Sequence, residues 1–307
     1  MIFSPITPKD YPKLKEYFKN HPYKLSIYSL PSLIVWSNHL FRVKYTIKGD
    51  SLIICAESER QPDDRYLLMP ISPVRDYSPE ELYQLAKELG FKRYSFIPED
   101  CLNKYNLKEI SLMFDLTEQK GFEDYIYQKD ALAKLKGNSL IRKRNLIHQF
   151  NKTYPEPGRV KIEKITAINT HECLEFLDVW CKNYPCEPNQ DENLACEKQA
   201  TINMLHNIDL FEAKGLLIRI DGTVCAFGIC SHLTQDMGVL NFEKAFSHIK
   251  GLYQFLDRTC AQQLFKDYQW INKESDLGIH GLRQSKRSYR PAMRVKSFCL
   301  DVRQVPL

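Results

Sequence analysis

Three carboxylates on neighbouring predicted strands are the first candidates for chemistry in this sequence. Glu243 lies within one strand, and Glu274 and Asp276 follow the next strand along the chain. A carboxylate in an opening between strands can accept a proton from a nucleophile or bind an ammonium group. The sequence also leaves open that each is an ordinary surface charge or is ion-paired to a nearby cation. Those cations are Lys244, Arg283 and Lys286.

Basic residues are concentrated in two segments of the chain. Residues 129–161 hold nine Lys and Arg against two acidic residues, and residues 283–296 hold six against none. Because the net charge is only +5, the rest of the chain carries −8. This asymmetry predicts an anionic partner, either the phosphates of a cofactor, a nucleic acid or a lipid surface. Solvated helix faces are the plain alternative for each segment.

Length and composition predict a soluble α/β protein of two domains. The chain has 307 residues, of which 43% are hydrophobic and 26% charged. No apolar run approaches the ~20 residues of a transmembrane segment, and the N-terminus does not resemble a signal peptide. The ten cysteines are spread out, mostly within apolar runs, so we expect reduced thiols, a cytoplasmic location and no metal site. The glycine-rich nucleotide-binding motifs, GxSxG, HExxH and Cys-x-x-Cys are absent.

The first half of the chain predicts a helix, several strands, a second helix and a further strand. A helix begins near Tyr11, and residues 24–72 are rich in β-forming runs. Ser78 opens the second helix with a capping box, and Gly90 ends it. Residues 122–150 are predicted to be mostly helical, and the Pro- and Gly-containing stretch 154–158 is the clearest break in the chain.

The second half holds the strongest local signal, a β-hairpin around Asp221-Gly222. Its strands are 215–220 and 223–231, and a third strand is predicted over 237–245. The further predicted elements are a helix from Leu252, a strand over 268–274, a basic helix over 282–290 and a last strand over 294–302.

This order of elements resembles the GNAT acyltransferase core. In that fold the turn after the third strand presents backbone N–H groups to the pyrophosphate of coenzyme A. Here the turn is 247–251, with Lys250 and Gly251, and its single glycine departs from the richer acetyl-CoA signature. The resemblance implies that the carboxylates converge in a V-shaped opening between strands. It also places Tyr289 where many GNAT enzymes use a tyrosine as general acid, although packing alone explains that residue equally well.

Two longer stretches resemble the phosphatidylglycerol lysyltransferase C-terminal domain family. They are DYIYQKDALAKLKGNSLIRKRNLIHQF (124–150) and the segments NFEKAF, IKGLYQFLDR and YQWINKESDLGIHGLRQSKRSYRP within 241–291. The resemblance implies two tandem GNAT-like domains with mixed, mostly antiparallel sheets. The expected ranges are a structural domain over 1–120, a basic helical linker over 121–153 and a site-bearing domain over 154–307.

The predicted function is acyl or aminoacyl transfer from acyl-CoA or aminoacyl-tRNA to an amine or hydroxyl, since relatives in the family move an amino acid from aminoacyl-tRNA. The candidate catalytic residues are Glu243, Glu274, Asp276 and Tyr289. The candidate donor-binding residues are Lys143, Arg144 and Asn145 of the family's linker signature, with Lys250, Gly251, Arg283 and Lys286. Two alternatives stay open: a catalytically silent module that binds tRNA, a nucleotide or a lipid headgroup, and an ordinary acetyl-CoA-dependent N-acetyltransferase. An anionic membrane surface fits the same charges.

Overall fold

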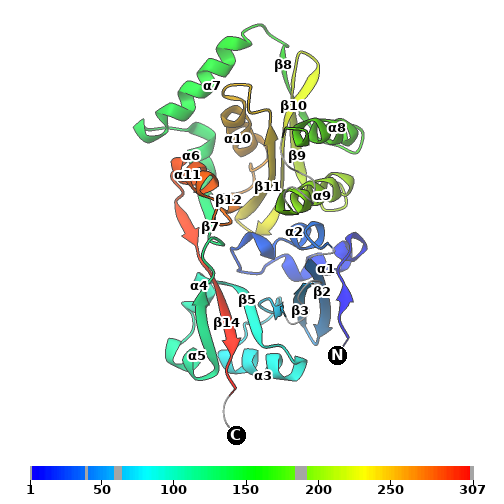
Figure 1. Cartoon of the computed structure of the whole chain (residues 1–307), viewed down its shortest axis with the longest axis vertical. Helices are drawn as coiled ribbons and strands as arrows, with labels where there is room; N and C mark the ends of the chain where they lie inside the picture. Colours follow the sequence, from blue (N-terminus) through cyan, green and yellow to red (C-terminus); the bar gives the residue numbers. More distant parts are fainter. Residues whose placement is uncertain (1, 39–40, 59–63, 184–191, 305–307) are drawn as a thin grey trace.

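The described strands form two mixed sheets, each with seven strands (Figure 1). The computed structural model describes residues 2–38, 41–58, 64–183 and 192–304. Most neighbouring strands are antiparallel, while β4–β5 and β11–β12 are parallel pairs. The predicted class, mixed α/β with two mostly antiparallel sheets, is confirmed.

The first sheet is built mainly from the N-terminal half. Its strand order is β1 (Ser4–Pro5), β2 (Phe41–Lys48), β3 (Ser51–Ser58), β4 (Arg65–Leu67), β5 (Arg93–Pro98), β14 (Ser297–Val302) and β6 (Phe114–Glu118). The helices of this half are α1 (Tyr11–Phe18), α2 (Leu30–Val35), α3 (Pro79–Leu89), α4 (Glu99–Leu102) and α5 (Leu107–Met113), with short 3₁₀ turns η1 (Pro8–Asp10) and η2 (Ser26–Tyr28).

The second sheet carries the candidate site. Its order is β13 (Met293–Val295), β7 (Asp124–Gln128), β12 (Trp270–Ser275), β11 (Met237–Ala245), β10 (Thr223–Thr234), β9 (Lys214–Ile220) and β8 (Val160–Lys164). Its helices are α6 (Lys129–Lys134), α7 (Ile141–Thr153), α8 (Thr170–Cys181), α9 (Glu192–His206), α10 (Leu252–Gln263) and α11 (His280–Ser288), with the turn η3 (Asn138–Leu140).

The two halves exchange strands. Strand β7, from the range predicted as a helical linker, lies in the second sheet between β12 and β13. Strand β14, from the range predicted as the second domain, lies in the first sheet between β5 and β6 (Figure 1). The predicted last strand is therefore two strands that belong to different sheets. The ranges 1–120, 121–153 and 154–307 do not coincide with the division between the sheets.

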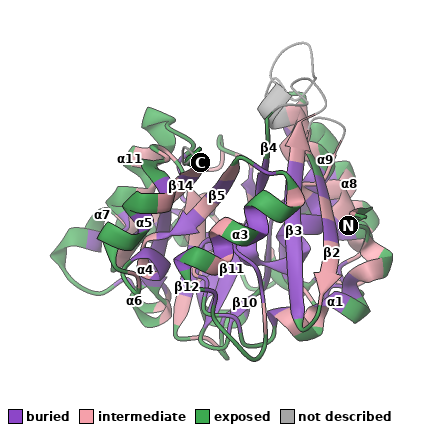
Figure 2. Ribbon diagram, turned by 90° about the horizontal axis from the view of Figure 1, so that it is seen from below, coloured by how far each residue is buried: buried purple, intermediate pink, exposed green. Residues whose placement is uncertain are grey.

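Two apolar clusters cover opposite faces of the second sheet. On one face, α6, α7 and α10 enclose a cluster that includes Leu216, Leu256 and Phe265. On the other face, α8 and α9 contribute to a larger cluster that continues into the first sheet. Purple buried strands run through the middle of the molecule in Figure 2. Side chains alternate along β11, so consecutive residues of this strand face different clusters.

Candidate active site

Strands β11 and β12 pair only at their beginnings. The register joins Met237 with Trp270, Gly238 with Ile271 and Val239 with Asn272, and no later pair follows between these strands in the described residues. Beyond that point β11 stays paired with β10, while β12 stays paired with β7. The parallel strands thus separate toward their C-terminal ends, as the V-shaped opening of the GNAT resemblance requires.

A buried ion-pair cluster bridges the separated strands. Lys273 of β12 places its Nζ 3.0 Å from Oε2 of Glu243 on β11 and 2.8 Å from Oδ1 of Asp257 on α10. Only 12% of the Lys273 side chain, 19% of Glu243 and 3% of Asp257 are exposed. One lysine therefore stands between two carboxylates, and the cluster is one positive charge short of neutrality without a further cation.

Tyr289 and Lys143 complete this arrangement. The Lys143 Nζ, from α7, lies 3.9 Å from the centroid of the Tyr289 ring, and the Lys273 Nζ lies 5.2 Å from the same centroid. An ammonium over an aromatic face is attracted by the ring quadrupole. We call Glu243, Asp257, Lys273, Tyr289 and Lys143 the wedge cluster. It joins β11, α10, β12, α7 and the end of α11.

The environment of the wedge cluster shifts the pKa values of its members. Burial raises the pKa of Glu243 to about 7, with Lys273 opposing the rise and Asp257 adding to it. Burial lowers the pKa of Lys273, but Asp257 and Glu243 outweigh this effect and hold it well above its ordinary value. Burial raises the pKa of Tyr289, and the Asp257 carboxylate adds to that rise, so the phenol stays protonated near pH 7. Burial lowers the pKa of Lys143.

The Asp257 carboxylate is held inside the wedge cluster. It is 2% exposed, and its Oδ1 lies 2.8 Å from the Lys273 ammonium. The Tyr289 hydroxyl is a second partner, because a hydrogen bond to Asp257 contributes to the raised pKa of Tyr289. A buried carboxylate needs such partners, because an unmet acceptor costs about 1–3 kcal/mol. Asp257 therefore helps to position Lys273 and Tyr289.

Glu274 lies apart from the wedge cluster. The charged groups that act on Glu274 include Glu197 of α9 and Lys244, whereas those that act on Glu243 include Lys273 and Asp257, so Glu274 lies on the α9 side of the sheet. Its backbone has a left-handed φ of 59°, unusual for a non-glycine residue. Burial raises its pKa to about 8, with Lys286 opposing the rise and Asp124 and Glu197 adding to it. The sequence predicted that Glu243 and Glu274 would converge, whereas the structure places them on different faces.

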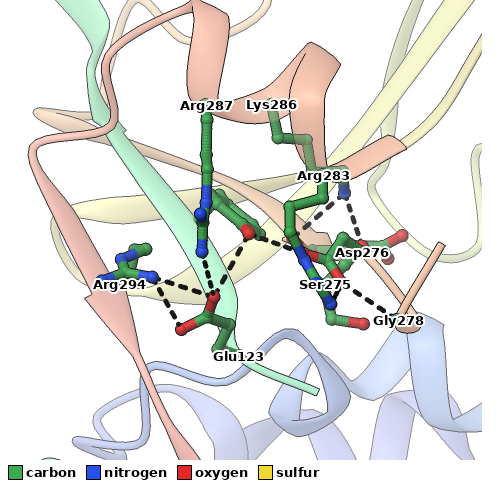
Figure 3. A network of polar contacts seen from close by, with 10 residues as sticks. Glu123, Ser275, Asp276, Gly278, Arg283, Lys286, Arg287 and Arg294 are labelled. Carbon is green, nitrogen blue, oxygen red and sulfur yellow. Dashed lines mark hydrogen bonds and ion pairs between the residues drawn. The ribbon is translucent and has the colours of Figure 1, made fainter. Parts of the chain in front are cut away.

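Asp276 and Arg283 form an ion pair that holds a loop (Figure 3). Asp276 is fully buried and accepts hydrogen bonds from Arg283 Nε at 2.9 Å, the Tyr125 hydroxyl at 2.6 Å and the Gly278 N–H at 2.9 Å. Burial raises the pKa of Asp276, but these hydrogen bonds outweigh it and the pKa lies below its ordinary value. Asp276 and Arg283 hold the segment between β12 and α11 in place. Neither residue contacts the wedge cluster.

Lys286 likewise binds groups of the protein itself. Its Nζ donates to three successive backbone carbonyls at the end of β12, those of Lys273, Glu274 at 3.1 Å and Ser275 at 2.7 Å. Burial lowers the Lys286 pKa to about 8, with Glu274 opposing the shift. Since an ammonium group has three donors, Lys286 has none left for the phosphate ligand that the sequence predicted.

Sequence and structure comparisons agree on the family. The family model for the C-terminal region of phosphatidylglycerol lysyltransferase matches residues 28–300. The chain belongs to this family. A conserved protein of unknown function from Bacteroides thetaiotaomicron is 26% identical, with a TM-score of 0.87 over 99% of this chain and 100% of its own. An uncharacterized protein from Mycoplasmoides gallisepticum is 22% identical over 256 residues, which are 78% of this chain and 76% of that protein.

Two further solved structures show the fold. The C-terminal domain of a putative lysylphosphatidylglycerol synthetase from Agrobacterium fabrum is 13% identical, with a TM-score of 0.63 over 95% of this chain and 91% of its own. A tandem GNAT protein from the clavulanic acid biosynthesis pathway is 8% identical, with a TM-score of 0.50 over 98% of both chains. The family member described here therefore has the tandem GNAT fold. None of its described helices has the length and apolarity to cross a membrane.

The turn that corresponds to the GNAT pyrophosphate site lies against α7. Gly251 begins α10 with a φ of 84°, and a Cβ at this position would overlap the carbonyl oxygen of Leu146. Phe150 of α7 packs on Phe255 of α10 with ring centroids 4.8 Å apart. Lys250 is exposed beside this contact. The glycine that the sequence assigned to donor binding is thus required for helix packing.

The remaining residues of the family's linker signature have different roles in α7. Arg144 donates to the carbonyls of Leu135 and Gly137, which close the turn after α6. Asn145 is exposed on the helix surface. Only Lys143 of the three reaches the wedge cluster, which follows from the ~100° rotation between successive helix residues.

Two residues of the wedge cluster were missed in the sequence. Asp257 lies within α10 three and four residues before the buried Cys260 and Ala261, so the helical period predicts a buried position. Lys273 shares a strand face with the buried Ile271, two residues earlier. The sequence signal for both residues was a charged side chain at a position that the helix or strand period assigns to the core.

Proposed function

We propose that this protein is an aminoacyltransferase that moves an aminoacyl group from aminoacyl-tRNA to an amine or hydroxyl acceptor at the wedge cluster. The observation that carries the proposal is Glu243, a carboxylate with a pKa of about 7, placed where β11 and β12 separate and beside Tyr289 and Lys143. A base whose pKa lies near the working pH is deprotonated in a large fraction of the molecules and is still basic enough to accept a proton. Family membership supports the reaction class.

The reaction can be assigned to the cluster with its protons balanced. The acceptor heteroatom forms a bond to the ester carbonyl carbon of the aminoacyl-tRNA, and its proton goes to Glu243. The carbon–oxygen bond to the terminal ribose then breaks, and the ribose oxygen takes a proton from the Tyr289 hydroxyl. Proton transfer from Glu243 through water restores Tyr289. Lys143 and Lys273 stabilise the negative charge that develops on the carbonyl oxygen.

The position of α7 favours a tRNA donor over coenzyme A. The main chain of α7 lies against Gly251, where a GNAT acetyltransferase would accept the pyrophosphate. Lys143 of the same helix reaches Tyr289, so α7 belongs to the site. An acetyl-CoA enzyme would need α7 to move away from this turn, whereas an aminoacyl-tRNA donor carries no pyrophosphate that has to reach it.

Radiolabelled aminoacyl-tRNA species test the proposal directly. Each is incubated with the protein and with amine or hydroxyl acceptors, including phosphatidylglycerol vesicles, while acetyl-CoA is tested in parallel. We expect turnover with a charged tRNA, a loss of about 10²–10⁴-fold in Glu243→Gln, and a smaller loss in Tyr289→Phe. Glu88→Gln, an exposed charge paired with Lys48, is the matched control. Turnover with acetyl-CoA alone, or equal rates in Glu243→Gln and Glu88→Gln, contradicts the proposal.

A further inference from the structure

A cavity of about 290 Å³ lies at the junction of the two halves, away from the wedge cluster. Its walls come from α1, from the segment of η2 and α2, and from the end of β10, and Figure 1 shows α1 and α2 between the two sheets. Leu233 in this wall lies five residues along β10 from Gly228, the cross-strand partner of Glu243. At ~3.3 Å per residue, the cavity therefore lies about 16 Å along the sheet from Glu243.

The inner surface of the cavity is apolar and aromatic. Its buried residues are Tyr11, Phe18, Tyr28, Leu30, Pro31 and Leu233. Both tyrosine hydroxyls already donate within the protein, Tyr11 to the Phe211 carbonyl at 2.8 Å and Tyr28 to the Phe96 carbonyl at 3.0 Å. The inner surface therefore suits an apolar group of a ligand.

The rim of the cavity is charged, and its charges balance. Lys15, Glu16, Lys19 and Glu212 give it two positive and two negative charges. His232, which also lines the cavity, adds no charge at pH 7, because desolvation of its ring lowers its pKa. Since a site favours the ligand whose charges complement its own, this rim fits a zwitterion better than an anion or a cation.

Two of the rim charges are available to a ligand. The Lys15 Nζ is 2.7 Å from Oε1 of Glu212, so these two residues pair with each other. In the described part of the chain, the Lys19 ammonium and the Glu16 carboxylate form no ion pair and no side-chain hydrogen bond. They lie three residues apart at the end of α1, where such positions are neighbours on the helix surface. One cation and one carboxylate thus stand together beside an apolar cavity.

We infer that this cavity binds a free α-amino acid with an apolar side chain. Lys19 binds the carboxylate, Glu16 binds the ammonium group, and the side chain enters the aromatic interior. Cavities near 300 Å³ are at the small end of ligand sites, so the occupant is a small metabolite and not a nucleotide or a lipid. Because both halves form the cavity, the bound amino acid contacts α1 and β10 together and stabilises their junction.

Calorimetric titration of the whole chain with amino acids tests the inference without requiring turnover, so its outcome is separate from that of the proposed function. We expect phenylalanine and leucine to bind with a Kd of about 1 mM or lower. Alanine should bind at least about tenfold more weakly than phenylalanine, because it buries less apolar surface. Phenethylamine and hydrocinnamate keep the ring and one charge each, and both should bind about fivefold more weakly than phenylalanine.

Two variants test the assigned charges. Lys19→Gln and Glu16→Gln should each weaken phenylalanine binding by about fivefold. Lys13→Gln is the matched control, because Lys13 is an exposed lysine at the same helix but outside the cavity. It is expected to bind phenylalanine like the wild type. No binding of phenylalanine or leucine at ~10 mM, equal affinity for alanine and phenylalanine, phenethylamine binding as tightly as phenylalanine, or equal affinities of Lys19→Gln and Lys13→Gln overturns the inference.

Discussion

Glu243 and Lys273 depend on each other for their protonation states. Burial raises the pKa of Glu243 to about 7, and the Lys273 ammonium at 3.0 Å keeps it from rising further. If Glu243 is the base, the rate rises with pH through about 7 as its carboxyl loses a proton. Lys273→Met removes the opposing cation, so we expect the ascending limb of the pH–rate profile to move up by about one unit.

The same variant leaves Asp257 buried without its cation, so Lys273→Arg serves as the conservative comparison. It keeps the positive charge and should leave the ascending limb near pH 7. The pH–rate profiles of the three proteins are measured over the pH range in which each stays folded. An ascending limb that stays in place in Lys273→Met, or moves to lower pH, argues against Glu243 as the base.

Part of the candidate site could be predicted from residue types and their spacing in the sequence. Glu243, Tyr289 and Lys143 were candidates in the sequence, and the structure brings them together. Lys286 and Arg283 were interpreted as phosphate ligands because a cation on a basic helix gives no sign of its partner. Their partners are backbone carbonyls and Asp276, which only the folded chain brings near. The functional roles of the wedge cluster stay predictions until turnover is measured.

At the scale of elements, Gly251 determines how closely α7 approaches α10. Its φ of 84° and the nearby Leu146 carbonyl both disfavour a side chain. Gly251→Ala is expected to lower the free energy of unfolding by about 2–4 kcal/mol through backbone strain and displacement of α7. Gly281→Ala, within α11 and with open space around the added Cβ, should change stability by less than about 1 kcal/mol. Urea denaturation of both variants measures this, and equal stabilities would contradict the packing argument.

Lys286 joins α11 to the end of β12. Lys286→Met leaves three carbonyls without their donor, and we expect a loss of about 2–3 kcal/mol in the free energy of unfolding. The folded-state pKa of about 8 lies below the ordinary value, so the unfolded chain binds more protons between about pH 8 and 10. The stability contributed by Lys286 therefore increases as pH rises through this window. The difference between wild type and Lys286→Met should grow from pH 8 to 10 in denaturant titrations, and a shrinking difference contradicts the assigned pKa.

Local signals predicted some elements closely. Ser78 accepts from the Glu81 N–H and caps α3, Gly90 ends that helix with a φ of 70°, and Asp221-Gly222 joins β9 to β10. Strand β7 was predicted as helix because its run of four buried residues, Asp124 to Tyr127, has no alternation to reveal a strand. Its burial on both faces arises only in the folded chain, where β7 pairs with β12 and β13 and its side chains join both apolar clusters. Such long-range pairing is absent from local sequence patterns.

At the scale of the whole molecule, the strand exchange joins the two sheets into one folding unit. Strand β14 lies between β5 and the edge strand β6 of the first sheet, and the larger apolar cluster runs from that sheet to α8 and α9. Leu300 of β14 is 1% exposed, while its cross-strand partner Leu116 is 40% exposed. Leu300→Ala should therefore cost about 2–5 kcal/mol in unfolding free energy, and Leu116→Ala less than about 1 kcal/mol.

The exchange of strands between the sheets leads to a further prediction for Leu300→Ala. Because the chain crosses between sheets at β7 and β14, the second sheet should lose stability together with the first. Hydrogen exchange under native conditions measures the two sheets separately, through the amides of β5 and β11. We expect the slowest amides of both strands to lose protection by the same free energy in Leu300→Ala and to stay unchanged in Leu116→Ala. Loss of protection in β5 with full protection in β11 would show that the second sheet is stable without the first, and the wedge cluster would then need no support from the N-terminal half.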